Sequence, residues 1–194
     1  RAVPSGNMRV TFINHATTLI QQDGVNVITD PIYSERCAPT TFIGPRRVRP
    51  PGLRMTDLPR LDAVVLSHNH YDHMDVATLK KLQRGFPAMR IFAGLGNKAF
   101  LEGEGLNHVT ELDWWQSVQV GALGITSVPN QHFSNRGLTD PDGTLWTGYV
   151  FTVAAGNLRS PSRRSARRST STPGCSKTCG SRTSTRRNYC RSKT

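Results

Sequence analysis

Short runs of apolar and β-branched residues, bounded by Gly, Pro, Asp or Ser, recur along the first 157 positions. Such runs predict strands, and the Asp-Gly pair at positions 23 and 24 predicts a tight turn between two of them. The predicted strands are Met8–Ile13, Thr17–Gln22, Val25–Thr29, Leu61–Ser67, Arg90–Ala93, Val118–Val120, Ile125–Val128 and Thr144–Val153. The first three follow one another directly, so we expect them to open a sheet.

Two stretches predict helices. In Asp75–Gln83 the apolar residues recur three positions apart, which places them on one helix face, and Lys98–Glu102 predicts a shorter helix. Before the first helix, Ser34–Met55 is rich in Pro, Gly and Arg without any period and predicts a long surface loop. Strands and helices mixed in this way indicate an α/β or α+β fold.

The charged residues are distributed unevenly, and the excess of basic residues lies at the end of the chain. Positions 1–156 hold 14 Lys and Arg against 13 Asp and Glu, whereas positions 157–194 hold 11 basic residues and no acidic one. The net charge of +12 is therefore a property of residues 158–194, whose Arg, Ser and Thr follow no apolar pattern. We expect residues 1–157 to form the domain and this tail to be disordered.

Cysteine usage and hydropathy bear on the compartment. Cys37 stands alone in the domain, while Cys175, Cys179 and Cys190 all lie in the tail, so the domain lacks a disulfide framework. No window approaches the roughly 18 to 20 apolar residues of a membrane span. The sequence therefore predicts a cytoplasmic protein, with membrane contact limited to the periphery.

The densest chemistry lies between a predicted strand and a predicted helix. Ser67-His68-Asn69-His70-Tyr71-Asp72-His73 places three imidazoles and a carboxylate within six residues. These groups suit zinc or a similar borderline metal. His68 and His70 are two apart in an extended segment and can point the same way, whereas Asp72 and His73 follow at the turn and can face a second metal. The alternative is that these are ordinary exposed polar residues of a loop. The close spacing of the three histidines and the aspartate directly after an apolar strand disfavours that alternative.

Several segments resemble one enzyme family. The His68-x-His70-x-Asp72-His73 motif is similar to the hallmark of the metallo-β-lactamase superfamily. The resemblance narrows to the branch of N-acyl-phosphatidylethanolamine phospholipase D and its bacterial relatives. It is carried, besides the motif, by Asn14-His15-Ala16-Thr17, Thr29-Asp30-Pro31, Gly44-Pro45-Arg46-Arg47 through Pro50-Pro51, Glu111-Leu112-Asp113-Trp114-Trp115 and Gln131-His132-Phe133-Ser134.

The resemblance implies a metal centre and a reaction. It implies that His68, His70 and His132 hold one zinc and that Asp72 and His73 hold part of a second, with Asp72 also assigned to catalysis. A metal-bound hydroxide would attack the phosphorus of a phosphodiester. The implied substrate is an N-acyl-phosphatidylethanolamine-like phospholipid, the activity that of a zinc-dependent hydrolase, and no specific nucleic acid is implied.

The family fold is a four-layer αββα sandwich, of which this chain resembles the first half, with a mixed sheet. The second half supplies a bridging Asp and a late His, and no Asp or His follows Gly156. We therefore expect at most one zinc here. Our hypothesis is that the tail is an out-of-frame reading. A zinc-binding remnant without turnover, or a polyanion binder acting through the tail, are the alternatives, and exposed apolar strand faces would follow from the missing half.

Three further residues could belong to the site. Asp30 could orient a ligand histidine, or simply cap a turn. His15 could line the site or be a core or turn histidine, and Arg136 could meet a phosphate or be a solvated loop residue. For Trp114 and Trp115 we expect core packing in preference to a wall for an acyl chain.

Overall fold

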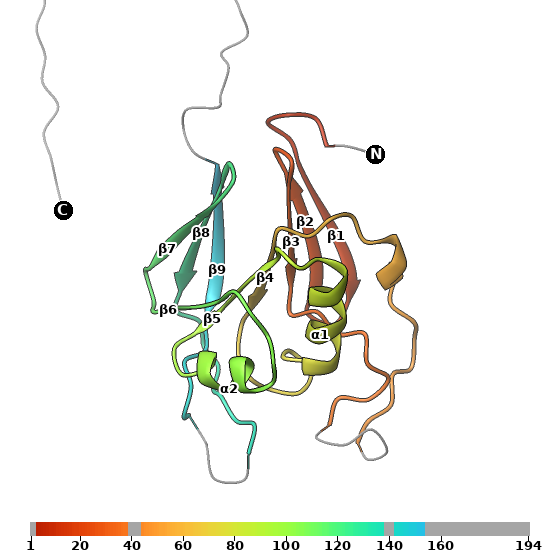
Figure 1. Cartoon of the computed structure of the whole chain (residues 1–194), viewed down its shortest axis with the longest axis vertical. Coiled ribbons are helices and arrows are strands. Elements are labelled where there is room, and N and C mark those ends of the chain that lie inside the picture. The colour runs from red at the N-terminus through yellow and green to blue at the C-terminus, as the bar shows by residue number, and fades with distance from the viewer. Residues whose placement is uncertain (1–2, 39–43, 138–141, 154–194) are drawn as a thin grey trace, which may run out of the picture. The chain divides into compact units, whose positions relative to one another are not determined.

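The predicted strands form two sheets in the computed structural model, in which residues 3–38, 44–137 and 142–153 are described (Figure 1). The larger sheet has the strand order β1-β2-β3-β4-β5-β6, with β1 to β3 antiparallel and β3 to β6 parallel. Its strands are β1 (Met8–Asn14), β2 (Thr17–Gln22), β3 (Val25–Thr29), β4 (Ala63–Leu66), β5 (Arg90–Gly94) and β6 (Val109–Leu112). The antiparallel second sheet contains β7 (Ser117–Val120), β8 (Leu123–Val128) and β9 (Gly148–Val153). The mixed sheet predicted from the sequence is confirmed.

The hairpin turn between β2 and β3 is confirmed as well. Asp23 and Gly24 both have positive φ, 47° and 81°, as a two-residue hairpin turn requires. The register pairs Gln22 with Val25 directly across the turn, so the apolar residues of both strands keep a common face.

Alternate residues of the six-stranded sheet supply two separate cores. One face, which includes Ile28, Val64 and Ile91, packs with Leu79 and Leu82 of helix α1 (Val76–Gly85) and with Leu101 of helix α2 (Lys98–Gly103). The opposite face packs against the second sheet. The six-stranded sheet contributes Val25, Val27, Ala63, Val65, Phe92 and Leu112 to this core, and the second sheet contributes Val120, Leu123 and Ile125. The described residues therefore form three layers, helices, sheet and sheet.

Some predicted boundaries were wrong. The predicted Leu61–Ser67 strand covers only β4, and the predicted Thr144–Val153 strand begins at Gly148 as β9. Strand β6 was not predicted, because its sequence Val-Thr-Glu-Leu has apolar residues only at its two ends. The predicted long loop contains an isolated bridge between Arg36 and Arg46, and the 3-10 turn η1 (Met55–Asp57) begins at its end.

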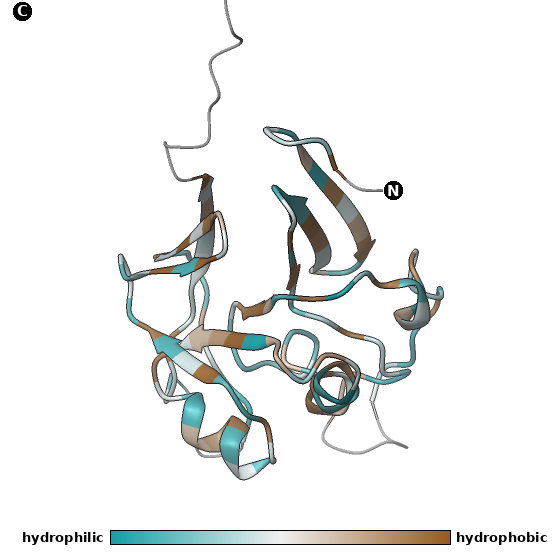
Figure 2. Cartoon of the chain, turned by 45° about the horizontal axis from the view of Figure 1, so that its top comes forward, coloured by the Kyte–Doolittle hydropathy of each residue, from teal (hydrophilic) through white to brown (hydrophobic). Residues whose placement is uncertain are grey.

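Strand β1 leaves an apolar face uncovered. Val10 pairs with Ile20, which pairs with Val27, so the three share the face that meets the second sheet elsewhere. On β1 this face is open, with Val10 60% and Phe12 68% exposed. Figure 2 colours the chain by hydropathy and shows hydrophobic positions, in brown, along the strands next to the N-terminus. The exposed apolar surface expected from the sequence is thus present at this edge strand.

The tail, residues 158–194, lies outside the described residues. Within the described part, no helix has the length and apolarity that crossing a membrane demands.

Gly94, the last residue of β5, is a sensitive position. A Cβ placed there would lie 2.9 Å from the carbonyl carbon of Leu145 and would overlap the carbonyl oxygen. The same loop donates the Thr147 N–H to the Ser67 carbonyl, at the start of the candidate metal segment. Close packing of this loop against β5 therefore requires glycine.

We expect Gly94→Ala to lower the free energy of unfolding by about 1–3 kcal/mol, the usual effect of overpacking. Urea unfolding followed by circular dichroism measures it. Gly103→Ala is the control, because a Cβ at Gly103 meets nothing within 4 Å. Equal stability of the two variants would contradict the close approach.

Candidate metal centre

The segment that follows β4 turns back on itself before α1 begins. The N–H groups of His73 and Met74 both donate to the His70 carbonyl, at 3.0 and 2.8 Å. At the end of the segment, Asp75 caps α1 by accepting from the Thr78 N–H. This turn presents His68 and His70 on one side and Asp72 and His73 beside them, between a strand and a helix as the sequence predicts.

The first cluster contains His68, His70 and His132. Nε2 of His68 lies 3.0 Å from Nδ1 of His70 and 2.9 Å from Nε2 of His132. His132 comes from the loop after β8, so two sheets contribute to the cluster. Zinc bonds to imidazole of about 2.0–2.1 Å place tetrahedral ligand atoms roughly 3.3 Å apart, close to the separations observed. The three imidazoles therefore fit a divalent metal without rearrangement of the backbone.

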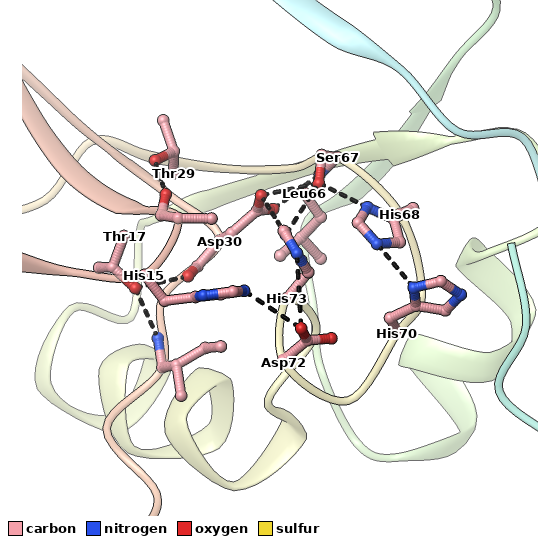
Figure 3. A network of polar contacts seen from close by, with 12 residues as sticks. His15, Thr17, Thr29, Asp30, Leu66, Ser67, His68, His70, Asp72 and His73 are labelled. Carbon is pink, nitrogen blue, oxygen red and sulfur yellow. Dashed lines mark hydrogen bonds and ion pairs between the residues drawn. The ribbon is translucent and has the colours of Figure 1, made fainter. Parts of the chain in front are cut away.

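The second cluster contains His15, Asp72 and His73 (Figure 3). Nε2 of His15 lies 3.1 Å from Oδ2 of Asp72, and Nε2 of His73 lies 3.9 Å from that same oxygen. The rings of His68 and His73 are 4.0 Å apart between centroids, so the two clusters are contiguous. The structure thus places every histidine except His108 in one site.

Asp30 connects Ser67 and His73 of the site through its side chain. Its side chain accepts from the Ser67 N–H and the Ser67 hydroxyl, both at 2.7 Å, and lies 2.9 Å from Nδ1 of His73. Asp30 is 5% exposed and has a positive φ of 34°. Of the two roles left open by the sequence, these contacts favour the orientation of a ligand histidine.

Ser67 is a site residue that sequence reasoning missed. Its hydroxyl lies 2.8 Å from Nδ1 of His68 and 3.3 Å from Nδ1 of His73, as well as contacting Asp30. The signal was present, because Ser67 directly precedes the motif at the end of a buried strand. A hydroxyl in this position engages the Nδ1 atoms of two histidines and leaves their Nε2 atoms facing the clusters.

Burial keeps the central histidine neutral. Burial, and next the charges of His73, His132 and His70, lower the pKa of His68 to about 3. The pKa of His70 is lowered as well, mainly by burial. For Asp72, burial raises the pKa, but His73, a backbone hydrogen bond, His15 and His70 together lower it below its usual value. Neutral imidazole and ionised carboxylate are the protonation states that bind metal ions.

Arg136 contacts the metal segment through its guanidinium group. One terminal nitrogen donates to the carbonyls of Asn69 and Met74, at 2.8 and 3.0 Å. The guanidinium carbon lies 4.3 Å from the ring centroid of Tyr71 and 4.9 Å from that of Phe100. These contacts brace the segment, so Arg136 is not the freely solvated loop residue that the sequence left open. The contact with a phosphate stays a prediction.

The expectation of core packing for both tryptophans was wrong. Trp115 is 71% exposed and has a positive φ of 71°. Trp114 is half-buried, donates its indole N–H to the Trp146 carbonyl and packs edge-on against that ring. A different aromatic residue lies at the site, because the Phe133 ring, 51% exposed, is 4.8 Å from His70 and 5.1 Å from His132.

Comparison with known proteins identifies a family for this arrangement. A family described as "Beta-lactamase superfamily domain" matches residues 25–159. The N-acyl-phosphatidylethanolamine-hydrolyzing phospholipase D 1 of Caenorhabditis elegans is 39% identical over 149 residues, covering 72% of this chain and 42% of that protein. An uncharacterized protein of Mycobacterium tuberculosis is 40% identical over 149 residues, with 76% and 40% covered.

A solved structure shares the fold. The isothiocyanate hydrolase from Delia radicum gut bacteria superposes with a TM-score of 0.56 at 27% identity, covering 75% of this chain and 58% of that one. This chain spans about two fifths of the length of the two curated relatives, 42% and 40%.

Proposed function

Because this chain belongs to the metallo-β-lactamase superfamily, we propose that it is a metal-dependent hydrolase whose metal is held by His68, His70 and His132. The observation that carries the proposal is the convergence of three imidazole nitrogens at separations of 2.9 and 3.0 Å. Such a donor set suits zinc, which we propose as the metal. Both sheets must be in place for the cluster to exist, since His132 follows β8.

The chain's own residues divide the remaining work. Asp30 fixes the ring of His73 through Nδ1, and Ser67 fixes His68 in the same way. Asp72 places an ionised carboxylate beside the first cluster, which accounts for the catalytic role we assign to it. A divalent metal held there acts as a Lewis acid and makes water a nucleophile near neutral pH. The exposed ring of Phe133 provides an apolar contact for substrate next to His70 and His132.

We further propose that the substrate is a phosphodiester of the N-acyl-phosphatidylethanolamine type. Two relatives named N-acyl-phosphatidylethanolamine-hydrolyzing phospholipase D support this choice, the worm protein at 39% identity and a mitochondrial protein of Saccharomyces cerevisiae at 29% identity. In this reaction water adds to phosphorus, and the bond from phosphorus to the ethanolamine oxygen breaks. The products are phosphatidic acid and an N-acylethanolamine, and membrane contact is confined to presentation of the lipid.

The test is hydrolysis of N-acyl-phosphatidylethanolamine vesicles by the zinc-loaded chain in ¹⁸O water, with products identified by mass spectrometry. We expect label in the phosphatidic acid and none in the N-acylethanolamine, because attack occurs at phosphorus. The His68→Ala, His70→Ala double variant is the control and should show only background hydrolysis. Zinc binding without turnover above that control would favour the remnant alternative, and label in the N-acylethanolamine would contradict the mechanism.

A further inference from the structure

We propose that Arg136 is a positioning residue of the metal centre, which holds the loop of His132 against the segment of His68 and His70. This inference rests on the proposed function, because the histidines that Arg136 positions are the proposed ligands of the metal. The role differs from both roles considered from the sequence, a contact with a phosphate and a solvated side chain. The affinity of the site for metal then depends on a residue that supplies no ligand atom.

His132 needs such a residue because its loop has no regular structure of its own. Residues 129–137 follow β8 and form neither a helix nor a strand. The His132 side chain is exposed, whereas His68 directly follows the end of a central strand and is 3% exposed. Holding an irregular backbone in one conformation costs conformational entropy, which contacts outside the loop must offset. The position of His132 is therefore set by the contacts that its loop makes elsewhere.

The guanidinium group of Arg136 joins the two ends of the turn that carries His70. Its Nη1 atom donates to the Asn69 carbonyl at 2.8 Å and to the Met74 carbonyl at 3.0 Å. The Met74 N–H donates to the His70 carbonyl, so the two acceptors lie on either side of this turn. Met74 is fully buried in the core. Arg136 thus connects the loop of His132 to a turn that is itself anchored in the core.

Asn69 receives a second hydrogen bond from the same loop. The Asn135 N–H donates to the side-chain oxygen of Asn69 at 2.9 Å, and Asn69 is only 3% exposed. The side chain of Asn69 therefore pairs with Asn135, and its carbonyl pairs with Arg136. Asn69 directly follows His68 in the chain. A shift of the loop relative to Asn69 would change the separation of 2.9 Å between Nε2 of His132 and Nε2 of His68.

The guanidinium group is itself held by two aromatic rings. Its central carbon lies 4.3 Å from the ring centroid of Tyr71, in the metal segment, and 4.9 Å from that of Phe100, in α2. A cation within about 6 Å of a ring centroid is attracted to the face of the ring. A planar guanidinium group can stack on such a ring and donate from its edge, which an ammonium group cannot do. The geometry therefore requires arginine at position 136.

The experiment measures zinc binding by the full chain and by Arg136→Met, which keeps an unbranched stem and loses every donor. Chelator-stripped protein is titrated with zinc in competition with a chromophoric chelator. We expect the affinity of Arg136→Met to fall about 10- to 100-fold, the usual effect of removing a residue that orients ligands. Arg136→Lys keeps the charge and a donor without the planar group, and should recover part of this loss.

Arg90→Met is a matched control. Nη1 of Arg90 donates to the Gln119 carbonyl at 3.0 Å, and the guanidinium carbon lies 4.7 Å from the Phe92 ring centroid. Arg90 begins β5, at the opposite end of the parallel strands from the metal segment. Both variants should lower the melting temperature of the metal-free protein, and only Arg136→Met should lose zinc affinity. Equal zinc affinity in the two variants would overturn the proposal, and is expected if Arg136 only contacts a phosphate.

A double variant tests whether Arg136 acts through His132. Two changes that act through one contact are not additive, whereas independent changes are. Arg136→Met should therefore weaken zinc binding much less in a His132→Ala background than in the wild type. Additive losses would overturn the proposed role. In a crystal structure of metal-free Arg136→Met, Nε2 of His132 should lie further than 2.9 Å from Nε2 of His68.

The proposed function and this inference fail in different ways. A wild type that binds zinc as tightly as Arg136→Met does would retain the proposed hydrolase site and overturn only the role of Arg136. A wild type that binds no zinc would overturn both.

Discussion

Replacing His68 and His70 together with alanine should remove the metal from the first cluster. The two residues supply two of the three imidazole nitrogens that meet there, at 3.0 Å from each other. Because changes outside the ligand shell already weaken metal sites 10–100-fold, loss of two ligands should weaken binding by more than roughly 100-fold. Elemental analysis of the purified protein and zinc titration of the stripped protein measure the effect.

The same variant should also lose stabilisation by zinc. A ligand present at 100 times its dissociation constant stabilises the folded state by about 2.7 kcal/mol. Added zinc should therefore raise the melting temperature of the wild type and of His108→Ala, and should raise that of the double variant much less. A double variant that retains wild-type zinc content would show that the cluster is not the metal site.

Asp30→Asn is the second change with a large expected effect. The carboxylate accepts two hydrogen bonds from Ser67 and contacts Nδ1 of His73, all within 2.9 Å, while only 7% of the side chain is exposed. An amide keeps the shape but loses the charge, and its NH₂ group faces groups that donate. Charge-assisted hydrogen bonds contribute about 1.5–3 kcal/mol each, so we expect a loss of roughly 3 kcal/mol in the free energy of unfolding.

The substitution should weaken metal binding as well. Without the carboxylate the Ser67 hydroxyl loses the acceptor that holds it against Nδ1 of His68, so the ring of His68 is less well fixed and the zinc affinity of the first cluster should fall about 10- to 100-fold. Asp62→Asn is the control, since Asp62 accepts from the Asn26 N–H at the opposite end of β4 and is 17% exposed. It should lose some stability and no zinc affinity. Equal zinc affinity in Asp30→Asn and Asp62→Asn would contradict the role of Asp30.

The local pattern of the sequence was sufficient for most of the strands. The β2 and β3 bounds were predicted as observed, because a β-branched run on each side of an Asp-Gly turn leaves one register that keeps both apolar faces together. Strand β6 was not predicted, because its own composition does not indicate a strand. It is a strand because it pairs with β5. The burial expected for Trp115 was wrong for a related reason, because the sequence does not show which neighbouring side chains cover a large aromatic residue.

The sequence by itself determined the part of the candidate metal centre that lies within six consecutive residues. His68, His70, Asp72 and His73 are close in space because they are close in the chain, after a buried strand and before a helix. Which other groups join them was decided only by the tertiary structure. His15 and Asp30 come from the ends of strands β1 and β3, and His132 follows β8 in the other sheet. Strand pairing and the packing of two sheets bring these residues together, and no spacing along the chain encodes such distances.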